Sequence, residues 1–405
     1  MKLLFITRLY SGFEPSLQNL TWKPEGVPTI YNLFNKISNT YDTSIIFTAK
    51  DSGKTYTSNW VEKDDKNMKV KNLNATIKVL TGIYYFPNIF PRKLSMILRD
   101  IRQLIKIIFF IQKNQPKLIY CDSANVVIAY ILTKIFPKKP IVVRVLGVCS
   151  FWRAILNSKR LVHKIYKLSY KGSFASVIGT QDGSGIEYWF DEVLKKNVPR
   201  YVLLNGVDTI KPKIKVKKIK NILFVGRLES YKGILVFIYA ILKVLEKYSG
   251  QVKIKIIGDG TLYKKAFGIC KKSGFIKNFD FMKSIPHEEV LSYHSNSDIY
   301  VSANADGNLI NTNLEAISSS ACMVIPKPQK EKLIDIQTHK YLKNSVLYYE
   351  INDTNDLAKK IIFLLENSDL ILQYKKKIGK IKSSIIKTWE ERIAEELKII
   401  KKLIN

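Results

Sequence analysis

The sequence has little of several features that mark common protein classes. It holds four cysteines, Cys121, Cys149, Cys270 and Cys322, and no two of them stand at a metal-ligand spacing. We therefore expect neither a zinc ribbon nor a disulfide scaffold. With 19 Gly and 13 Pro among 405 residues, the chain is not of the disordered or collagen-like kind. Acidic residues are also scarce, since 34 Asp and Glu stand against 66 Lys and Arg.

Long apolar runs are missing as well. Stretches such as residues 107–111 fall far short of the ~20 residues that span a bilayer. The apolar start is too short for the core of a signal peptide, and no small-residue cleavage site follows it. We therefore expect a cytoplasmic protein, either soluble or attached peripherally to the inner face of the cell membrane.

The charge balance points to an anionic partner. The formal net charge is +32 and the sequence pI is about 9.7, which favours nucleic acid, an acidic membrane surface or a phosphorylated substrate. Frequent Lys, Ile and Asn also fit an AT-rich genome, which would produce part of this charge without any binding. Nucleic acid is disfavoured, because the basic residues are spread along the chain and no nucleic-acid-binding motif is present.

Short β-branched runs alternate with longer amphipathic segments, which predicts an α/β fold with parallel sheets. Strands are predicted at 2–7, 44–48, 117–121, 141–145, 176–179, 201–204, 221–225, 253–257, 299–302 and 323–326. Helices are predicted at 234–248, 313–320 and 389–404. The lysine-rich segment 209–220 reads as a solvated linker between two doubly wound, Rossmann-like domains, 1–208 and 221–388, with 389–405 as a separate C-terminal helix.

One stretch of the first half is both basic and amphipathic. Between 92 and 117, apolar residues recur at helical spacing, and Asp100 is the only acid among seven Lys and Arg. Such a helix can lie on anionic lipid. The alternative is a core helix whose solvent face is basic.

A phosphate-binding turn is predicted after the strand at 221–225. Gly226 and Gly233 allow a tight passage into the following helix, whose N-terminus offers free N–H groups. Arg227 adds a bidentate donor for phosphate oxygens and Lys232 a point charge. A diphosphate clamp and an ordinary charged surface loop are both consistent with this pattern.

Two further turns follow predicted strands of the second half. Gly258 and Asp259 stand at one strand end, and ligands of open α/β sheets bind at that edge. Gly307 and Asn308 form a turn with exposed backbone amides, and the helix after it carries Glu315, which can accept hydrogen bonds from a ribose or simply favour the helix dipole.

Taken together, these motifs resemble a known enzyme family. The segments FVGRLESYKG (224–233), IIGDGTL (256–262), IPHEEVLSY (285–293) and LEAI (314–317) are similar to the C-terminal domain of family 4 glycosyltransferases with the GT-B fold. The resemblance covers about residues 210–395. It is looser in the first half, where it rests on the opening strand, the loop 26–29 and the segment 205–208. Residues 389–392 resemble the family's C-terminal helix, which crosses back to the first domain.

The resemblance implies a retaining transfer of a sugar from a nucleotide-sugar, with UDP favoured, to a lipid-linked or polysaccharide acceptor in cell-surface glycan synthesis. It implies no metal and no other cofactor. Arg227 and Lys232 would hold the diphosphate as the catalytic pair, and Glu315 the ribose. The donor residues expected on this basis are Gly226, Arg227, Lys232, Gly258, Asp259, Ile285, Asn308, Leu309, Asn311 and Glu315. Further donor or acceptor candidates in the first half are Gly26, Arg144, Gly147 and Asp182.

Two departures from the family pattern leave other functions open. The first glutamate of the E-x7-E motif would fall at Gly307, beside Asp306. The histidine that many relatives place after the strand at 141–145 is absent. A retaining enzyme assisted by the donor phosphate needs no protein nucleophile, so activity remains compatible with both. The alternatives are an inactive GT-B subunit that supports a partner enzyme and a nucleotide-sugar 2-epimerase.

Overall fold

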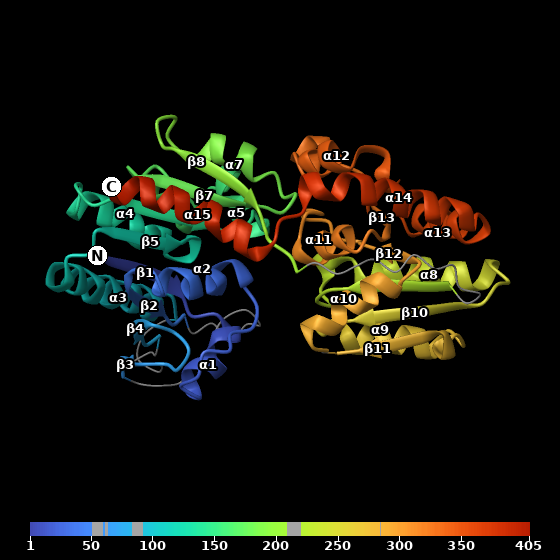
Figure 1. The fold of residues 1–405 in the computed structure, drawn as a ribbon, viewed down its shortest axis with the longest axis horizontal. Coiled ribbons are helices and arrows are strands. Elements are labelled where there is room, and N and C mark those ends of the chain that lie inside the picture. Colours follow the sequence, from blue (N-terminus) through green and yellow to red (C-terminus); the bar gives the residue numbers. More distant parts are fainter. Residues whose placement is uncertain (51–59, 61–63, 83–91, 209–219, 284) are drawn as a thin grey trace.

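The computed structural model describes residues 1–50, 60, 64–82, 92–208, 220–283 and 285–405. Residues 209–219, which make up nearly all of the predicted basic linker, lie outside this part. The chain forms two α/β domains, each built on its own sheet, and the two lie side by side (Figure 1).

The first domain is built on an eight-stranded sheet in the order β3-β4-β2-β1-β5-β6-β7-β8. Only β3 runs antiparallel to its neighbour. The strands are β1 (Lys2–Arg8), β2 (Asp42–Thr48), β3 (Lys66–Met68), β4 (Ala75–Leu80), β5 (Leu118–Asp122), β6 (Ile141–Val145), β7 (Ser176–Gln181) and β8 (Arg200–Leu204). Every residue of β5, β6 and β7 is buried, as expected of parallel strands covered by helices on both faces.

Helices cover both faces of this sheet. They are α1 (Glu14–Gln18), α2 (Pro28–Ser38), α3 (Arg92–Asn114), α4 (Val126–Ile135), α5 (Ser150–Asn157), α6 (Leu161–Ser169) and α7 (Ile186–Val193). One core lies between the sheet and α2, around Phe5, Phe34 and Phe47. The other lies beneath α3, α4 and α7, with Ile107 and Trp189 among its members.

The second domain is built on a six-stranded, fully parallel sheet in the order β11-β10-β9-β12-β13-β14. Its strands are β9 (Lys220–Val225), β10 (Val252–Ile257), β11 (Phe279–Met282), β12 (Ile299–Val301), β13 (Cys322–Pro326) and β14 (Leu347–Tyr349). Its helices are α8 (Ile234–Lys247), α9 (Tyr263–Lys272), α10 (His287–Asn296), α11 (Asn311–Ser318), α12 (Ile336–Leu342), α13 (Thr354–Glu366) and α14 (Ser368–Ile385). The order reverses between β9 and β12, and in the first domain between β1 and β5. Ligands of doubly wound sheets bind outside the carboxyl ends of the strands at such switch points.

The last helix, α15 (Trp389–Ile404), returns to the first domain. A capping box at Thr388 and Glu391 fixes its start. Ile393, Leu397 and Ile400 then enter the core that also holds Phe34 of α2. The chain is thus tied to the first domain at both its N- and C-terminal elements.

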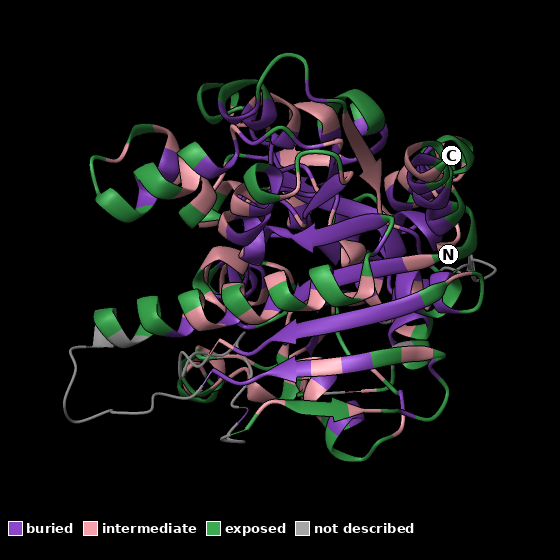
Figure 2. Ribbon diagram, turned by 90° about the vertical axis from the view of Figure 1, so that its left-hand side faces the viewer, coloured by how far each residue is buried: buried purple, intermediate pink, exposed green. Residues whose placement is uncertain are grey.

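The helix α3 packs along one side only. Its C-terminal half buries Ile107 and Ile111, whereas Ile97 and Phe109 are 55% and 65% exposed. Figure 2 shows the exposed face of the long helix that follows the grey segment. The first half of the predicted apolar stripe therefore faces solvent, whereas its second half packs on the sheet.

Candidate functional site

The loops after β9 and β10 meet backbone to backbone at the switch point of the second domain. Gly226 donates its N–H to the carbonyl of Ile257 at 2.9 Å. A Cβ on Gly258 would lie 2.0 Å from the carbonyl oxygen of Gly226, and both glycines have φ above +140°. Only glycine tolerates that combination. The sequence motif therefore encodes a backbone contact that brings two strand ends together.

Two cations stand in the loop after β9. Arg227 is exposed and Lys232, in the short 3-10 turn Ser230–Lys232, is partly buried before α8 begins. Burial and the nearby charge of Arg227 lower the pKa of Lys232 to about 8, while Asp182 and Asp306 act in the opposite direction. A lysine held at such a pKa gains from an anionic ligand that offsets the repulsion.

The loop after β12 runs alongside this segment. The N–H of Ala305 donates to the carbonyl of Tyr231 at 3.0 Å. Gly233 has φ +70°, and a Cβ there would meet the backbone oxygen of Ala303 at 2.2 Å. The neighbouring strands β9 and β12 thus present their loops together, as a switch-point site requires.

Glu315 projects from the middle of α11 and is 5% exposed. One carboxylate oxygen lies 3.7 Å from Nε2 of His294 on α10. The imidazole packs edge-on against Tyr300, with 4.9 Å between ring centroids. Sequence reasoning placed Glu315 near the nucleotide and missed His294, because the two come from separate helices and share no motif.

The exposed amides predicted at the 307–309 turn are not found. The N–H of Asn308 donates to Oδ1 of Asp335 at 2.6 Å, and the N–H of Leu309 donates to the carbonyl of Asp182 at 2.9 Å. Both side chains are fully buried as well. The prediction that this turn offers free amides to a ligand is wrong, because contacts with Asp335 and with the first domain already use them.

Asn311 also faces the first domain. Its Oδ1 accepts a hydrogen bond from Nδ2 of Asn205 at 2.7 Å. Oδ1 of Asn205 in turn accepts from Oγ1 of Thr29 at 2.8 Å. The loop at the start of α2 is therefore joined to α11 through one asparagine of the segment between the domains.

A second contact between the domains centres on the turn after β7. Asp182 fills the space beside Gly147, where a Cβ would lie 2.0 Å from the carboxylate. The carbonyl of Gly183 accepts from the N–H of Asp335 at 2.7 Å. Burial raises the pKa of both Asp182 and Asp335 to about 6. The carboxylate of Asp182 thus fills the space that a side chain at position 147 would need. Asp182 also lies at the contact between the two domains.

The same contact accounts for the departure at Gly307. This residue has φ +131°, and a Cβ would come within 2.6 Å of the carbonyl of Asp182. The turn of the first domain occupies the space that a side chain would need. The nearest acids that influence Lys232 are instead Asp182 and Asp306.

Of the remaining candidates, Arg144 is contradicted by its surroundings. It is fully buried, its guanidinium donates to the carbonyl of Ile178 and to Oγ1 of Thr180, and its Nε lies 3.7 Å from Glu396 of α15. It therefore anchors the C-terminal helix rather than facing a ligand. Three candidates remain. Gly26 lies in a loop, and a Cβ there would have no heavy atom within 4 Å. Asp259 is exposed in the loop after β10, and Ile285 packs at the edge of the second-domain core.

We also searched the described residues for metal-binding groups, membrane-spanning helices and cavities. Within these ranges no group of three His, Cys, Asp or Glu side chains is arranged to hold a metal ion. No helix in the described part is both long and apolar enough to cross a bilayer. A hollow of about 600 Å³ lies at the amino ends of β2 and β4, near Asp42 and Ala75, which is the sheet edge opposite the switch point.

Comparison with known proteins agrees with this architecture. Residues 207–381 match the family described as glycosyl transferases group 1. A comparison with curated protein sequences finds no match. Among solved structures, sucrose-phosphate synthase from Thermosynechococcus elongatus is similar with a TM-score of 0.72 at 12% identity, covering 99% of each chain.

Two further structures show the same likeness. Anabaena HepE in complex with UDP has a TM-score of 0.65 at 13% identity, covering 98% of this chain and all of that one. The lipopolysaccharide outer core galactosyltransferase WaaB has a TM-score of 0.59 at 16% identity, covering 99% of each chain. The expected GT-B fold is confirmed. The match of residues 207–381 to group 1 glycosyl transferases supports a glycosyltransferase.

Proposed function

We propose that this glycosyltransferase moves a sugar, with retention of configuration, from a nucleotide-sugar held by the second domain to an acceptor held by the first. The observation that carries the proposal is the paired loop of Gly226 and Gly258, which sets Arg227 and Lys232 at the switch point between β9 and β12. Structural relatives have been solved with UDP, and with UDP and glucose. We extend a uridine nucleotide donor to this chain on that basis.

The chemistry follows from two cations beside a diphosphate. When the bond between the anomeric carbon and the diphosphate oxygen breaks, the diphosphate leaves with the electron pair. Arg227 and Lys232 then stabilise the developing negative charge. The acceptor hydroxyl attacks from the same face and passes its proton to the departing phosphate oxygen. This route uses no protein nucleophile and no metal.

Glu315 is proposed to accept hydrogen bonds from the ribose hydroxyls. Its carboxylate is nearly buried and is held near His294. A carboxylate fixed in this way accepts two hydrogen bonds without first losing much rotamer freedom. His294 is proposed to orient it.

The acceptor is proposed to be lipid-linked or part of a growing glycan, met at an anionic membrane surface. Large apolar side chains are exposed on α3 and α6, namely Leu94, Ile97, Leu98, Ile101, Ile105, Phe109, Leu161, Val162, Ile165 and Leu168. Exposed Lys159, Arg160 and Lys164 flank those on α6. Apolar side chains among cations match the headgroup region of anionic bilayers.

The donor proposal is tested by titrating UDP into the wild type and into Arg227→Ala. Removing a charge-assisted bidentate donor should weaken binding by about 1.5–3 kcal/mol, roughly tenfold or more, with folding unchanged. Arg200→Ala is the matched control, because Arg200 is partly exposed at the start of β8 and, within the described part of the chain, pairs with Asp191. Equal UDP affinity in all three proteins would contradict the clamp.

A second candidate function is favoured by one observation, the lack of an acidic side chain at Gly307. An inactive subunit would bind UDP and yet turn over no nucleotide-sugar. Incubation with a panel of nucleotide-sugars separates the cases. Release of the nucleotide supports the transferase, an altered donor sugar indicates a 2-epimerase, and tight binding without either product indicates the inactive subunit.

The membrane proposal is tested by sedimentation with vesicles that contain anionic lipid. Binding should fall steeply as salt increases, because exposed charges are screened within about 8 Å at physiological ionic strength. Ile101→Asp should weaken binding, whereas Phe363→Asp, at an exposed apolar position on α13, should leave it unchanged. Failure to bind acidic vesicles at low salt would exclude this mode of attachment.

A further inference from the structure

The switch point of the first domain, between β1 and β5, has a chemistry of its own. Arg8 is the last residue of β1 and Asp122 the last of β5, and the two strands are neighbours. Lys50 follows β2, which pairs with the other side of β1. The topology therefore gathers these residues at the sheet edge where ligands of doubly wound domains bind.

Among the described residues, no ion pair joins the carboxylate of Asp122 to the guanidinium of Arg8. Its Oδ2 accepts from the N–H of Arg8 at 2.7 Å, from Oγ1 of Thr7 at 2.9 Å and from the hydroxyl of Tyr10 at 3.0 Å. Its Oδ1 accepts from Asn125. Neutral donors thus occupy both oxygens, while the Nε of Arg8 is buried without a hydrogen-bond partner.

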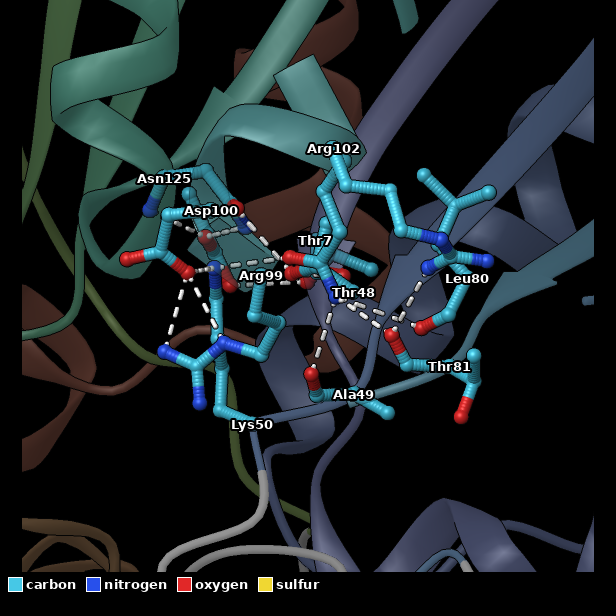
Figure 3. A network of polar contacts seen from close by, with 12 residues as sticks. Thr7, Thr48, Ala49, Lys50, Leu80, Thr81, Arg99, Asp100, Arg102 and Asn125 are labelled. Carbon is cyan, nitrogen blue, oxygen red and sulfur yellow. Dashed lines mark hydrogen bonds and ion pairs between the residues drawn. The ribbon is translucent and has the colours of Figure 1, made fainter. Parts of the chain in front are cut away.

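Two more cations, Lys50 and Arg99, share the single carboxylate of Asp100. Nζ of Lys50 donates to Asp100 at 2.8 Å and to Gln103 at 2.9 Å, and Nε of Arg99 donates to the same oxygen of Asp100 at 2.9 Å. Figure 3 shows Lys50, Arg99 and Asp100 converging near Thr48. Both cationic side chains are nearly buried, and burial lowers the pKa of Lys50. Among the described residues, these two cations share one paired carboxylate, and Asp122 also favours the charged form of Lys50.

Tyr166 of α6 connects Arg8 with this group. Burial raises the pKa of its phenol, Asp100 raises it further, and Arg8 and Arg99 both lower it. All three charged side chains thus act electrostatically on one buried phenol. Tyr166 itself is held by Phe151 and Trp152, whose rings lie 5.3 and 5.4 Å away.

Arg153 of α5 links this region to the second domain. Its Nη1 donates to the carbonyl of Ser184 at 2.9 Å, while its Nε and Nη2 are buried without hydrogen-bond partners. Ser184 ends the turn whose Asp182 and Gly183 bond to Leu309 and Asp335. We group four cations here as the basic cluster: Arg8, Lys50 and Arg99 at the first switch point, and Arg153, which bonds to the turn at the contact between the domains.

We propose that the basic cluster binds a phosphate group carried by the acceptor. This rests on the proposed function in placing the acceptor in the first domain. Among the described residues, Asp100 pairs with both Lys50 and Arg99, and Asp122 bonds to the backbone of Arg8, so a phosphate dianion would balance the remaining positive charge. Buried guanidinium N–H groups without partners would gain the hydrogen bonds they lack. The phosphate can belong to a free sugar phosphate or to a lipid phosphate.

The test is calorimetry with defined probes, carried out with UDP present in saturating amount so that the donor site is filled. The probes are a hexose 6-phosphate, a hexose 1-phosphate and a short-chain polyprenyl phosphate in neutral detergent, each compared with its dephosphorylated form. At least one phosphorylated probe should bind, and its dephosphorylated form should bind at least about tenfold more weakly. The preferred probe identifies the source of the phosphate.

Variants locate the site. Arg8→Gln and Arg153→Gln should each weaken the phosphorylated probe about tenfold or more while leaving UDP affinity unchanged. Arg200→Gln, at the start of β8, an outermost strand of the same sheet, should change neither the affinity for the probe nor that for UDP. Binding of no phosphorylated probe, or equal binding of probe and dephosphorylated form, would overturn the proposal. Loss of UDP binding by the wild type would instead refute the donor site, so the two failures are distinguishable.

Discussion

The two switch points of this chain differ in how they are built. In the second domain, the candidate site is formed by the backbone of two loops, in which Gly226 and Gly258 are in contact. Its two cations, Arg227 and Lys232, lie in the same short segment as Gly226, residues 226–232. In the first domain, charged side chains from several separate segments, among them Arg8, Lys50 and Arg99, lie at one sheet edge. One site is therefore readable as a motif and the other only in three dimensions.

The difference extends to the arginines. Arg227 is exposed beside a lysine, whereas Arg144 is fully buried and anchors α15 through Glu396. Sequence position at a strand end made both of them candidates for ligand binding. Only the surroundings separate the two, because Arg144 is buried beside Glu396 and Arg227 is exposed at the switch point.

The largest expected effect is a loss of stability when the buried arginine of this comparison, Arg144, is replaced. Arg144→Leu leaves Glu396 buried with Arg392 alone as its cationic partner. Removing one member of a buried charged network should cost about 3–5 kcal/mol in the free energy of unfolding. Urea denaturation followed by circular dichroism measures it. Arg200→Leu breaks only the exposed pair with Asp191 and should cost about 1 kcal/mol or less; equal costs would show that Arg144 is not an anchor.

The next effect concerns the backbone of the donor loop. Gly258→Ala forces a Cβ to within 2.0 Å of the carbonyl of Gly226 at φ +142°, so we expect a loss of about 3 kcal/mol in stability and weaker UDP binding. Gly26→Ala, at φ +65° with no atom within 4 Å, should cost about 1 kcal/mol. Thermal unfolding of both variants checks the difference, and similar melting temperatures would contradict it.

How far the sequence predicts this molecule depends on how local each feature is. All ten predicted strands are present, whereas β3, β4, β11 and β14 were not predicted. The three-residue strands β3 and β14 are too short to show a period, and Lys78 interrupts β4. The turn between β9 and α8 was predicted because its glycines and cations are contiguous. The burial of Arg144 and the basic cluster were not, because Glu396 and Arg99 reach those places only through the tertiary fold.

A smaller effect concerns the ribose. Glu315→Gln replaces a carboxylate acceptor with an amide and should weaken UDP binding by about 1–3 kcal/mol. The variant should also lose its preference for UDP over a 2′,3′-dideoxy analogue. Glu366→Gln, exposed at the end of α13, is the matched control. If Glu315→Gln discriminates the analogue as well as the wild type does, Glu315 serves only to pair with His294.

The smallest effect is the pH dependence of donor binding. Lys232 has a pKa of about 8, so it carries its charge below that pH and loses it above. UDP affinity should be level near pH 7 and fall about three- to tenfold by pH 9. Lys232→Ala should flatten this profile, and Lys247→Ala, exposed at the end of the following helix α8, should keep it. An unchanged profile in Lys232→Ala would assign the titration to another group.

The central claim is that the two switch points divide the reaction, with the donor diphosphate in the second domain and the acceptor phosphate in the first. One calorimetric comparison tests it most directly, with UDP and the preferred phosphorylated probe each titrated into Arg227→Ala and Arg8→Gln. The account predicts a crossed pattern, in which Arg227→Ala loses UDP binding alone and Arg8→Gln loses probe binding alone, each by about tenfold or more. Loss of both ligands in both variants, or of neither in either, would contradict it.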